Sequence, residues 1–318
     1  MTSKVHMIVG YPASGKSTLA QTMKDDGYEI LNRDTIGGKI IDLVPRMVNM
    51  INSGKKIVLD NTFATAKVRK PFIEAAQSLG VEVCCTIMGT TIEQAQWGAC
   101  SRMIERYGKI LSPQEIKDSK DPNMFPPAVL FKYRKEYEKP SKNEGFSKID
   151  TCPYVLRLPS DCTGKAIILD YDGTLRDTKS GAKWPRDPED VYALPNRKEV
   201  LQKYIDDGYI LLGASNQSGV AKNQPTEDIC IACFERTNEL LGIDIEIGYC
   251  PHKVPPISCY CRKPMPGMGV RWVLKHKLDP KKCIMVGDAT SDKTFAKRCG
   301  FEFKHADDFF LVPAGVNR

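Results

Sequence analysis

Short apolar runs alternate with amphipathic stretches along the first half of the chain. Buried strands are predicted at residues 4–10, 56–60 and 81–88. Helices are predicted at residues 17–24 and 66–80, the second of which ends at a glycine. This alternation of strands and helices predicts a parallel α/β sheet. Residues 108–150 are rich in Lys, Pro and Tyr and show no clear strand, so we expect them to form a lid and an edge of this domain.

The same alternation begins again after a break in the pattern at residues 153–164. Further strands are predicted at residues 165–169, 209–212 and 282–286, and further helices at residues 197–206, 226–241 and 269–276. The sequence therefore predicts the α/β class, with two doubly wound parallel-sheet domains at residues 1–158 and 159–318.

Length, hydropathy and charge narrow the class of protein. A chain of 318 residues fits two ordinary domains. No run of about 18 apolar residues appears and no signal peptide is evident, so we expect no membrane span and a cytoplasmic location, or a nuclear one in a eukaryote. Residues 1–158 carry 23 basic and 17 acidic side chains, a net of +6 out of the total of +7. The basic excess suits a polyanionic substrate in the first half, although ATP alone would also favour it.

A glycine-rich motif lies between the first predicted strand and the first predicted helix. Residues 10–17 match G-x-x-x-x-G-K-[ST]. Glycines let the backbone wrap a phosphate, whose oxygens then accept N–H groups at the helix N-terminus. Lys16 is expected to neutralise charge on the β- and γ-phosphates, and Ser17 to ligate Mg²⁺. The candidate ATP-binding residues are Gly10, Ser14, Gly15, Lys16, Ser17 and Thr18.

Polar residues that could handle a phosphate acceptor follow further along the first half. Asp34, after the apolar stretch 28–31, could take the proton of an attacking hydroxyl. Alternatively it caps the next helix, and spacing alone leaves both interpretations open. Residues 60–62 form a second polar cluster. Arg102 and Arg106, four residues apart, could stabilise transferring charge from one helix face or could form a solvated face.

Two aspartates mark a second reaction centre at the start of the second domain. Asp170 and Asp172 follow a predicted strand within Asp-Tyr-Asp-Gly-Thr. In such a pair the first carboxylate can attack phosphorus and form an aspartyl phosphate. The second can protonate the leaving alcohol and later activate water. Mg²⁺ would offset the repulsion between carboxylate and phosphate. Alone, the motif could also be a turn with calcium-like ligands.

Three further motifs argue for the reaction centre. Ser215 and Asn216 follow the predicted strand at 209–212, where a hydroxyl and backbone N–H groups could hold phosphoryl oxygens. Arg262-Lys263-Pro264 supplies a cation for the phosphoaspartate. Asp288 and Asp292 follow the predicted strand at 282–286 and place carboxylates for Mg²⁺. The candidate phosphate ligands are therefore Lys263, Ser215, Asn216 and Arg262. The candidate magnesium ligands are Ser17, Asp170, Asp172 and Asp288, with Asp292 in support.

A cysteine-rich segment precedes the Arg-Lys-Pro motif. It has the pattern C-x-H-x₆-C-x-C. Three thiolates and one imidazole form a closed tetrahedral set that suits structural Zn²⁺. The loop between them contains three prolines and little apolar content, so it needs something to hold it. The alternative is four unrelated reduced side chains. The candidate zinc ligands are Cys250, His252, Cys259 and Cys261.

The first half resembles the kinase domain of the 5′-polynucleotide kinase/3′-phosphatase family. The matching stretches are residues 9–18, 32–35, 60–62, 91–95, 133–135 and 144–146. The resemblance implies that Asp34 is the general base and that Lys16 and Ser17 hold ATP and Mg²⁺. It implies that Arg102 and Arg106 are lid arginines at the donor phosphates. Arg33 and Thr62 would contact the acceptor or hold Asp34.

The second half resembles the haloacid dehalogenase superfamily, whose four motifs occur here in order. The resemblance implies Asp170 as nucleophile, Asp172 as acid/base, Ser215 and Lys263 as phosphate ligands, and Asp288 as a magnesium ligand. The cysteine-rich loop resembles the zinc loop of histidinol-phosphate and heptose-bisphosphate phosphatases, which polynucleotide 3′-phosphatases generally lack. Residues 286–288 and 306–310, by contrast, resemble the polynucleotide 3′-phosphatases.

The expected function is therefore the healing of broken nucleic-acid ends. ATP would phosphorylate a 5′-hydroxyl of DNA or RNA, and a 3′-phosphate would be hydrolysed, which leaves the ends that a partner ligase requires. One alternative is a kinase and phosphatase of small molecules such as sugars, which the zinc loop favours for the second domain. Another is a catalytically silent nucleic-acid-binding adaptor, against which the intact Lys16, Asp34, Asp170 and Asp172 argue.

Overall fold

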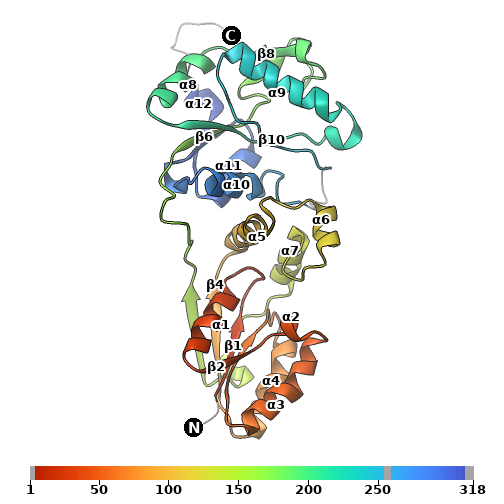
Figure 1. Ribbon diagram of the computed structural model, residues 1–318, viewed down its shortest axis with the longest axis vertical. Coiled ribbons are helices and arrows are strands. Elements are labelled where there is room, and N and C mark those ends of the chain that lie inside the picture. The colour runs from red at the N-terminus through yellow and green to blue at the C-terminus, as the bar shows by residue number, and fades with distance from the viewer. Residues whose placement is uncertain (1–3, 254–258, 312–318) are drawn as a thin grey trace. The chain divides into compact units, whose positions relative to one another are not determined.

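The computed structural model of the chain describes residues 4–253 and 259–311 (Figure 1). The contacts divide the chain into two compact units. The first comprises residues 1–99 and 119–156, and the second comprises residues 100–118 and 157–318. Helix α5, Ile92–Tyr107, begins in the first unit and ends in the second. Among the described helices, none is long and apolar enough to cross a membrane.

The first unit is built on a five-stranded parallel sheet. Its strands are β1 (Lys4–Val9), β2 (Tyr28–Leu31), β3 (Lys56–Asp60), β4 (Val83–Gly89) and β5 (Lys148–Pro153). Their order is β2-β3-β1-β4-β5, which places β1 in the centre. The three predicted strands are confirmed. The expectation of no strand within residues 108–150 is wrong, because β5 begins at Lys148 and pairs with residues 84–89 of β4.

Helices cover both faces of this sheet, because side chains of a strand alternate between its faces. Val5, Met7 and Val9 of β1 belong to the core that includes α3 (Leu43–Asn52) and α4 (Ala66–Ser78). Ile8 belongs to the opposite core, with Ala20 of α1 (Lys16–Asp25). Figure 1 shows α1 on one side of the strands and α3 with α4 on the other. The shorter helices are α2 (Arg33–Ile36), α6 (Pro113–Ser119) and α7 (Pro127–Glu136).

The second unit is built on a four-stranded parallel sheet. Its strands are β6 (Ala166–Leu169), β9 (Ile210–Gly213), β12 (Ile284–Gly287) and β13 (Glu302–His305), in the order β13-β12-β6-β9. An antiparallel pair joins β7 (Arg176–Thr178) to β8 (Val191–Ala193), and a parallel pair joins β10 (Ser215–Asn216) to β11 (Tyr249–Cys250). The strands predicted in this half are confirmed within two residues at each end.

Helices again lie on both faces. Ile167, Leu169 and Val286 share a core with residues of α8 (Arg197–Asp206), α9 (Glu227–Leu241) and α12 (Ala306–Phe309). Helices α10 (Gly267–Lys275) and α11 (Thr290–Cys299) lie on the other side of the strands (Figure 1). In both sheets the first strand is central and the chain leaves it to both sides. Each unit therefore has a topological switch point at the carboxyl end of its first strand, where open α/β sheets bind ligands.

Candidate active sites and metal centre

The glycine-rich loop after β1 has the close backbone packing that its sequence predicts. Gly15 caps α1 with a left-handed φ of 88°, and a Cβ on Gly10 would lie 2.7 Å from Cβ of Met88. Lys16 is buried, and its ammonium donates to the carbonyl oxygens of Gly10, at 3.2 Å, and of Tyr11, at 2.6 Å. The lysine is thus folded back along the loop, next to the N-terminus of α1.

Donors in this loop fit a phosphate chain. The Ser14 hydroxyl is buried and has no hydrogen-bond partner among the described residues, whereas its carbonyl oxygen accepts from Thr90. A buried polar group without a partner is costly unless a ligand or water satisfies it. The N–H groups that open α1 have the polarity to bind an anion. ATP phosphates suit this set of donors.

Asp34 lies just after the edge strand β2. The cap of α2 is Asn32, whose side-chain oxygen accepts from the backbone N–H groups of Asp34, at 2.7 Å, and of Thr35. The alternative that Asp34 caps this helix is therefore wrong. Its carboxylate, 35% exposed, accepts from the Arg33 guanidinium at 2.5 and 3.1 Å. Asp34 is left accessible and oriented by its neighbour.

Residues at and just after the end of β3 form hydrogen bonds both to the Asn32–Asp34 segment and to the glycine-rich loop. The Asn32 amide donates to the carbonyl oxygen of Asp60, at 2.6 Å, and to its carboxylate, at 3.1 Å. The carbonyl oxygen of Thr62 accepts from the backbone of Gly10 at 3.5 Å and from the Tyr133 hydroxyl at 3.4 Å. Neither Asn32 nor Tyr133 was assigned a role from the sequence, although both lie within the stretches that carry the family resemblance.

The two arginines predicted at the donor phosphates lie on the second half of α5. Arg102 and Arg106 are separated by one turn of this helix, and the contacts place both with the second unit. Their role at the donor phosphates stays a prediction.

In the second unit, Asp170 lies directly after the central strand β6 and faces a buried lysine. The Lys263 ammonium is 3.0 Å from Oδ1 of Asp170 and 2.6 Å from Oδ1 of Asp292, and its side chain is 1% exposed. One carboxylate oxygen each of Asp170, Asp288 and Asp292 lies within 4.8 Å of the others. The structure thus brings together four residues predicted from three separate motifs.

The electrostatics of this cluster fit a divalent cation. Burial raises the pKa of Asp170 to about 7, with Lys263 opposing the rise and Asp292 and Asp172 adding to it. Burial and the nearby Asp292 also raise the pKa of Asp288. Three carboxylates around one lysine therefore carry more negative charge than their surroundings neutralise. Carboxylate oxygens in such an excess are the ligands that Mg²⁺ takes in proteins.

Asp172 is held by two side chains that the sequence did not single out. Its Oδ1 accepts from Nε of Arg176 at 2.8 Å, and its Oδ2 accepts from the Gln217 amide at 2.8 Å. The same amide donates to the buried Ser215 hydroxyl at 2.9 Å. Gln217 lies within a motif identified in the sequence, whereas Arg176 follows the Asp-Gly-Thr turn and its burial carries no sequence signal.

The predicted phosphate ligands surround this centre. The Asn216 side chain clasps the backbone of Lys263, accepting from its N–H at 2.8 Å and donating to its carbonyl oxygen at 2.9 Å. Asn216 thus positions the lysine through its backbone, a contact that its prediction as a substrate ligand did not include. Nη1 of Arg262 is buried and has no partner among the described residues. An anion could satisfy it.

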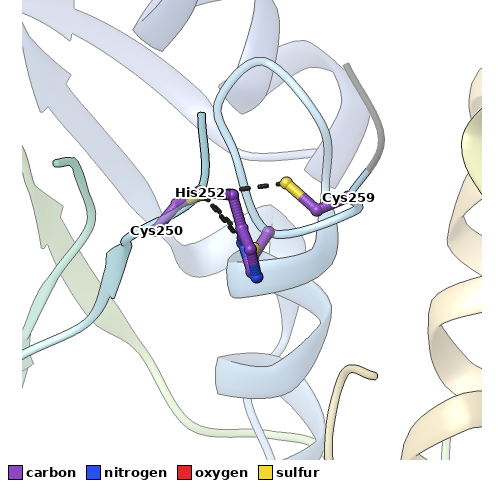
Figure 2. A group of neighbouring side chains, drawn as sticks. Cys250, His252 and Cys259 are labelled. Carbon is purple, nitrogen blue, oxygen red and sulfur yellow. Dashed lines mark hydrogen bonds between the residues drawn. The ribbon is translucent and has the colours of Figure 1, made fainter. Parts of the chain in front are cut away.

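The cysteine-rich segment forms a compact group of four side chains. Cys250 Sγ lies 3.4 Å from Nδ1 of His252, 3.7 Å from Sγ of Cys259 and 3.4 Å from Sγ of Cys261. His252 Nδ1 lies 3.1 Å from Sγ of Cys261. Figure 2 shows the side chains of Cys250, His252 and Cys259 pointing toward one another. The proline-containing stretch 254–258 lies outside the described residues.

The donor set and spacing fit zinc. Zn–S bonds of about 2.3 Å in a tetrahedron separate the sulfurs by roughly 3.8 Å, close to the distances found. Without a cation, hydrogen bonds with Cys250 and Cys261 lower the pKa of Cys259, whereas hydrogen bonds with Cys250 and Cys259 raise the pKa of Cys261. A divalent metal removes this conflict by binding every sulfur as thiolate.

The cluster of Cys250, His252, Cys259 and Cys261 is joined directly to the segments that carry the predicted phosphate ligands. Cys250 pairs with Asn216 across the β10–β11 ladder, and its carbonyl oxygen accepts from the backbone of Gln217 at 2.9 Å. Cys261 is separated from Lys263 by one residue. Order in the cluster therefore fixes the loops that carry Ser215 and Lys263.

Two family models match this chain. The model described as polynucleotide kinase 3 phosphatase matches residues 165–317, and the model described as AAA domain matches residues 5–103.

Curated relatives match the chain in part. The "Probable D-glycero-D-manno-heptose-1,7-bisphosphate 7-phosphatase" of Thermoplasma volcanium is 34% identical over 145 residues, which cover 44% of this chain and 97% of the relative. The D-glycero-beta-D-manno-heptose-1,7-bisphosphate 7-phosphatase of Pasteurella multocida is 33% identical over 142 residues, 42% of this chain and 76% of the relative. The bifunctional polynucleotide phosphatase/kinase of Schizosaccharomyces pombe is 27% identical over 153 residues, 48% of this chain and 34% of the relative.

Solved structures also match. The D,D-heptose 1,7-bisphosphate phosphatase of B. bronchiseptica, complexed with magnesium and phosphate, shares 28% identity at a TM-score of 0.40 and covers 44% of this chain and 78% of its own. The Pnkp1/Rnl/Hen1 RNA repair complex shares 16% identity at a TM-score of 0.29 and covers 96% of both chains.

Proposed function

We propose that the chain heals broken nucleic-acid ends, because it belongs to the polynucleotide kinase 3 phosphatase family through residues 165–317 and carries a P-loop kinase domain before them. The kinase would transfer the γ-phosphate of ATP to a 5′-hydroxyl, and the phosphatase would hydrolyse a 3′-phosphate. The two activities act on different ends of one break, so they do not oppose each other. The product ends are those that a ligase joins.

The first unit offers residues for each part of the kinase reaction. Lys16 and the N-terminus of α1 would hold the donor phosphates, and Ser17 would ligate Mg²⁺. Asp34, oriented by Arg33 at 2.5 Å, would accept the proton of the attacking hydroxyl. Thr62 would line the acceptor site. Arg102 and Arg106, which the contacts place with the second unit, would engage the donor phosphates.

The second unit supports hydrolysis through a covalent intermediate. A carboxylate oxygen of Asp170 would attack phosphorus as the bond to the substrate oxygen breaks, and Asp172 would give its proton to that oxygen. Water would then attack the aspartyl phosphate, with Asp172 taking the proton of the water. Lys263, Ser215 and Arg262 would hold the phosphoryl oxygens. Mg²⁺ bound by Asp170 and Asp288 would offset the repulsion between nucleophile and phosphate.

A paired assay of the purified chain tests this function. We expect ³²P transfer from ATP to a 5′-hydroxyl oligonucleotide and release of inorganic phosphate from a 3′-phosphate oligonucleotide, both dependent on Mg²⁺. DNA and RNA oligonucleotides of one sequence would show which polymer is preferred. Failure of transfer to both polymers, together with turnover of a phosphosugar, would contradict the proposal.

Hydrolysis of a small phosphorylated sugar is a second candidate for the second unit. The zinc-type cluster and the heptose-bisphosphate phosphatase of Thermoplasma volcanium, matched over 97% of its length, favour it. Comparison of kcat/KM for a heptose 1,7-bisphosphate and for a 3′-phosphate oligonucleotide separates the two candidates. A preference for the sugar of more than tenfold would assign this unit to small molecules while leaving the kinase proposal standing.

Loss of the metal from the cysteine cluster should inactivate one activity only. Zn²⁺ would hold the loop structurally through Cys250, His252, Cys259 and Cys261. We expect about one zinc per chain by metal analysis, and we expect Cys259→Ser to lose zinc and most phosphatase activity, because the cluster fixes the Ser215 and Lys263 loops. Kinase activity should persist. Cys283→Ser, a buried cysteine outside the cluster, is the matched control. Zinc-free protein with full phosphatase activity would refute the assignment.

A further inference from the structure

Arg176 is one of the few charged residues of the second unit that are buried. Its side chain is 1% exposed. Its guanidinium lies over the rings of Phe234, at 4.7 Å, and of Tyr171, at 5.3 Å, and its Nη1 donates to the buried Thr237 hydroxyl at 3.2 Å. Buried arginines are rare unless they are paired, and removing a partner from such a pair is strongly destabilising. A buried guanidinium therefore needs an anionic partner to offset the cost of its burial.

The anionic partner of Arg176 is Asp172. Nε of Arg176 donates to Oδ1 of Asp172 at 2.8 Å. The backbone of Arg176 closes the same turn, because its N–H donates to the carbonyl oxygen of Tyr171 and its own carbonyl oxygen accepts from Gly173. Phe234 and Thr237 of α9 contact the guanidinium, and the Tyr171 ring lies against it as well. Asp172 is thus anchored to a helix outside the catalytic loops.

We propose that Arg176 is a positioning residue that fixes the Asp172 carboxyl for proton transfer to the leaving oxygen of the substrate. With Gln217 on Oδ2, the carboxyl plane is held from both edges. When the P–O bond breaks, the proton of the Asp172 carboxylic acid moves to the departing oxygen, and the Asp172 carboxylate that remains pairs with the Arg176 cation. This inference rests on the proposed phosphatase chemistry but not on which phosphate ester is the substrate.

Leaving groups of different basicity separate this role from a merely structural one. An alkoxide, such as a nucleoside or sugar oxygen, needs a proton as it departs, whereas p-nitrophenolate is a weak base and does not. The kcat/KM value reports steps only up to the first irreversible one, here formation of the aspartyl phosphate, so later activation of water does not enter. Poor positioning of Asp172 should therefore affect alkyl esters selectively.

The test measures kcat/KM of the full-length wild type, Arg176→Met and Arg176→Lys on a 3′-phosphate oligonucleotide and on p-nitrophenyl phosphate. We expect Arg176→Met to lower the value for the oligonucleotide at least about tenfold, given that acid–base catalysis contributes roughly 10²–10⁴-fold. The value for p-nitrophenyl phosphate should change little, and Arg176→Lys should lie between. An equal fall for both substrates, or no fall for either, overturns the proposal.

Two further variants guard against misfolding. Thr237→Val removes one contact of the guanidinium without touching Asp172, and it should show the same selectivity in weaker form. Arg197→Met is a matched control, because Arg197 is also buried, lies over the Phe310 ring and donates to the carbonyl oxygen of Thr174. Any loss in that variant should be equal for both substrates. If the wild type cleaves no 3′-phosphate oligonucleotide, the proposal that this ester is the substrate is wrong. The role of Arg176 is then tested with a hexose phosphate, which is also an alkyl ester.

Discussion

Replacement of Asp170 by asparagine should lower the rate of phosphate release at least about 10³-fold. Removal of the nucleophile of another enzyme has an effect in this range. An amide cannot form the aspartyl phosphate, yet it keeps the shape of the carboxyl and a possible contact to Lys263. Kinase activity should survive, because the glycine-rich loop and Asp34 belong to the other compact unit. Phosphate release and ³²P transfer, measured on one preparation, check both halves of this expectation.

The matched control for this variant is Asp228→Asn, an exposed aspartate in the first turn of α9. It makes the same chemical change within the same unit but outside the catalytic loops, so phosphatase activity should stay at the wild-type level. Trapping provides a second readout. Wild-type protein quenched in acid during turnover of a ³²P-labelled substrate should retain label that Asp170→Asn lacks. Residual hydrolysis above a few per cent of wild type in Asp170→Asn would exclude this residue as the nucleophile.

Replacement of Lys16 by alanine should lower kinase activity about 10²–10³-fold and leave phosphatase activity unchanged. The ammonium is buried at the N-terminus of α1, and in the free protein it donates to two carbonyl oxygens of its own loop. On binding ATP it would exchange these for phosphate oxygens, and loss of one such electrostatic contact costs about 10²–10³-fold in kcat. Transfer of ³²P at saturating ATP measures the effect.

Lys24→Ala provides the comparison, because Lys24 lies exposed in the last turn of the same helix. Both variants remove one lysine from α1, so general changes in charge or helix stability would appear in both. We expect transfer by Lys24→Ala to match the wild type. Equal losses in the two variants would mean that Lys16 acts through the helix and not on the nucleotide.

The sequence predicted those strands and sites whose residues form a recognisable pattern within a short segment. The central strands were predicted because their apolar runs are buried on both faces, as the side chains of β1, β3, β6 and β12 are. Strand β5 was missed for the complementary reason. It lies at the edge of its sheet, and four of its six residues are exposed, so no apolar pattern marks it.

The candidate sites divide in the same way. The four cysteine-cluster residues lie within twelve positions of one another, and their spacing alone predicted that they meet. The contact between Lys263 and Asp170 joins distant segments, but each segment carried a motif of its own. Arg176 carried none, because an arginine in sequence gives no sign of burial. Only the packing of Phe234 and Thr237 from α9 makes it a partner of Asp172.

The clasp between Asn216 and the backbone of Lys263 limits how this loop can change over evolutionary time. One side chain must both donate to the lysine carbonyl oxygen and accept from its N–H. Aspartate has the same shape but no donor, and leucine has neither group, so substitutions that conserve volume do not conserve the contact. Spontaneous deamidation would make the aspartate substitution chemically. Deamidation of Asn216 would therefore remove the hydrogen bond to the lysine carbonyl oxygen and weaken the hold on Lys263.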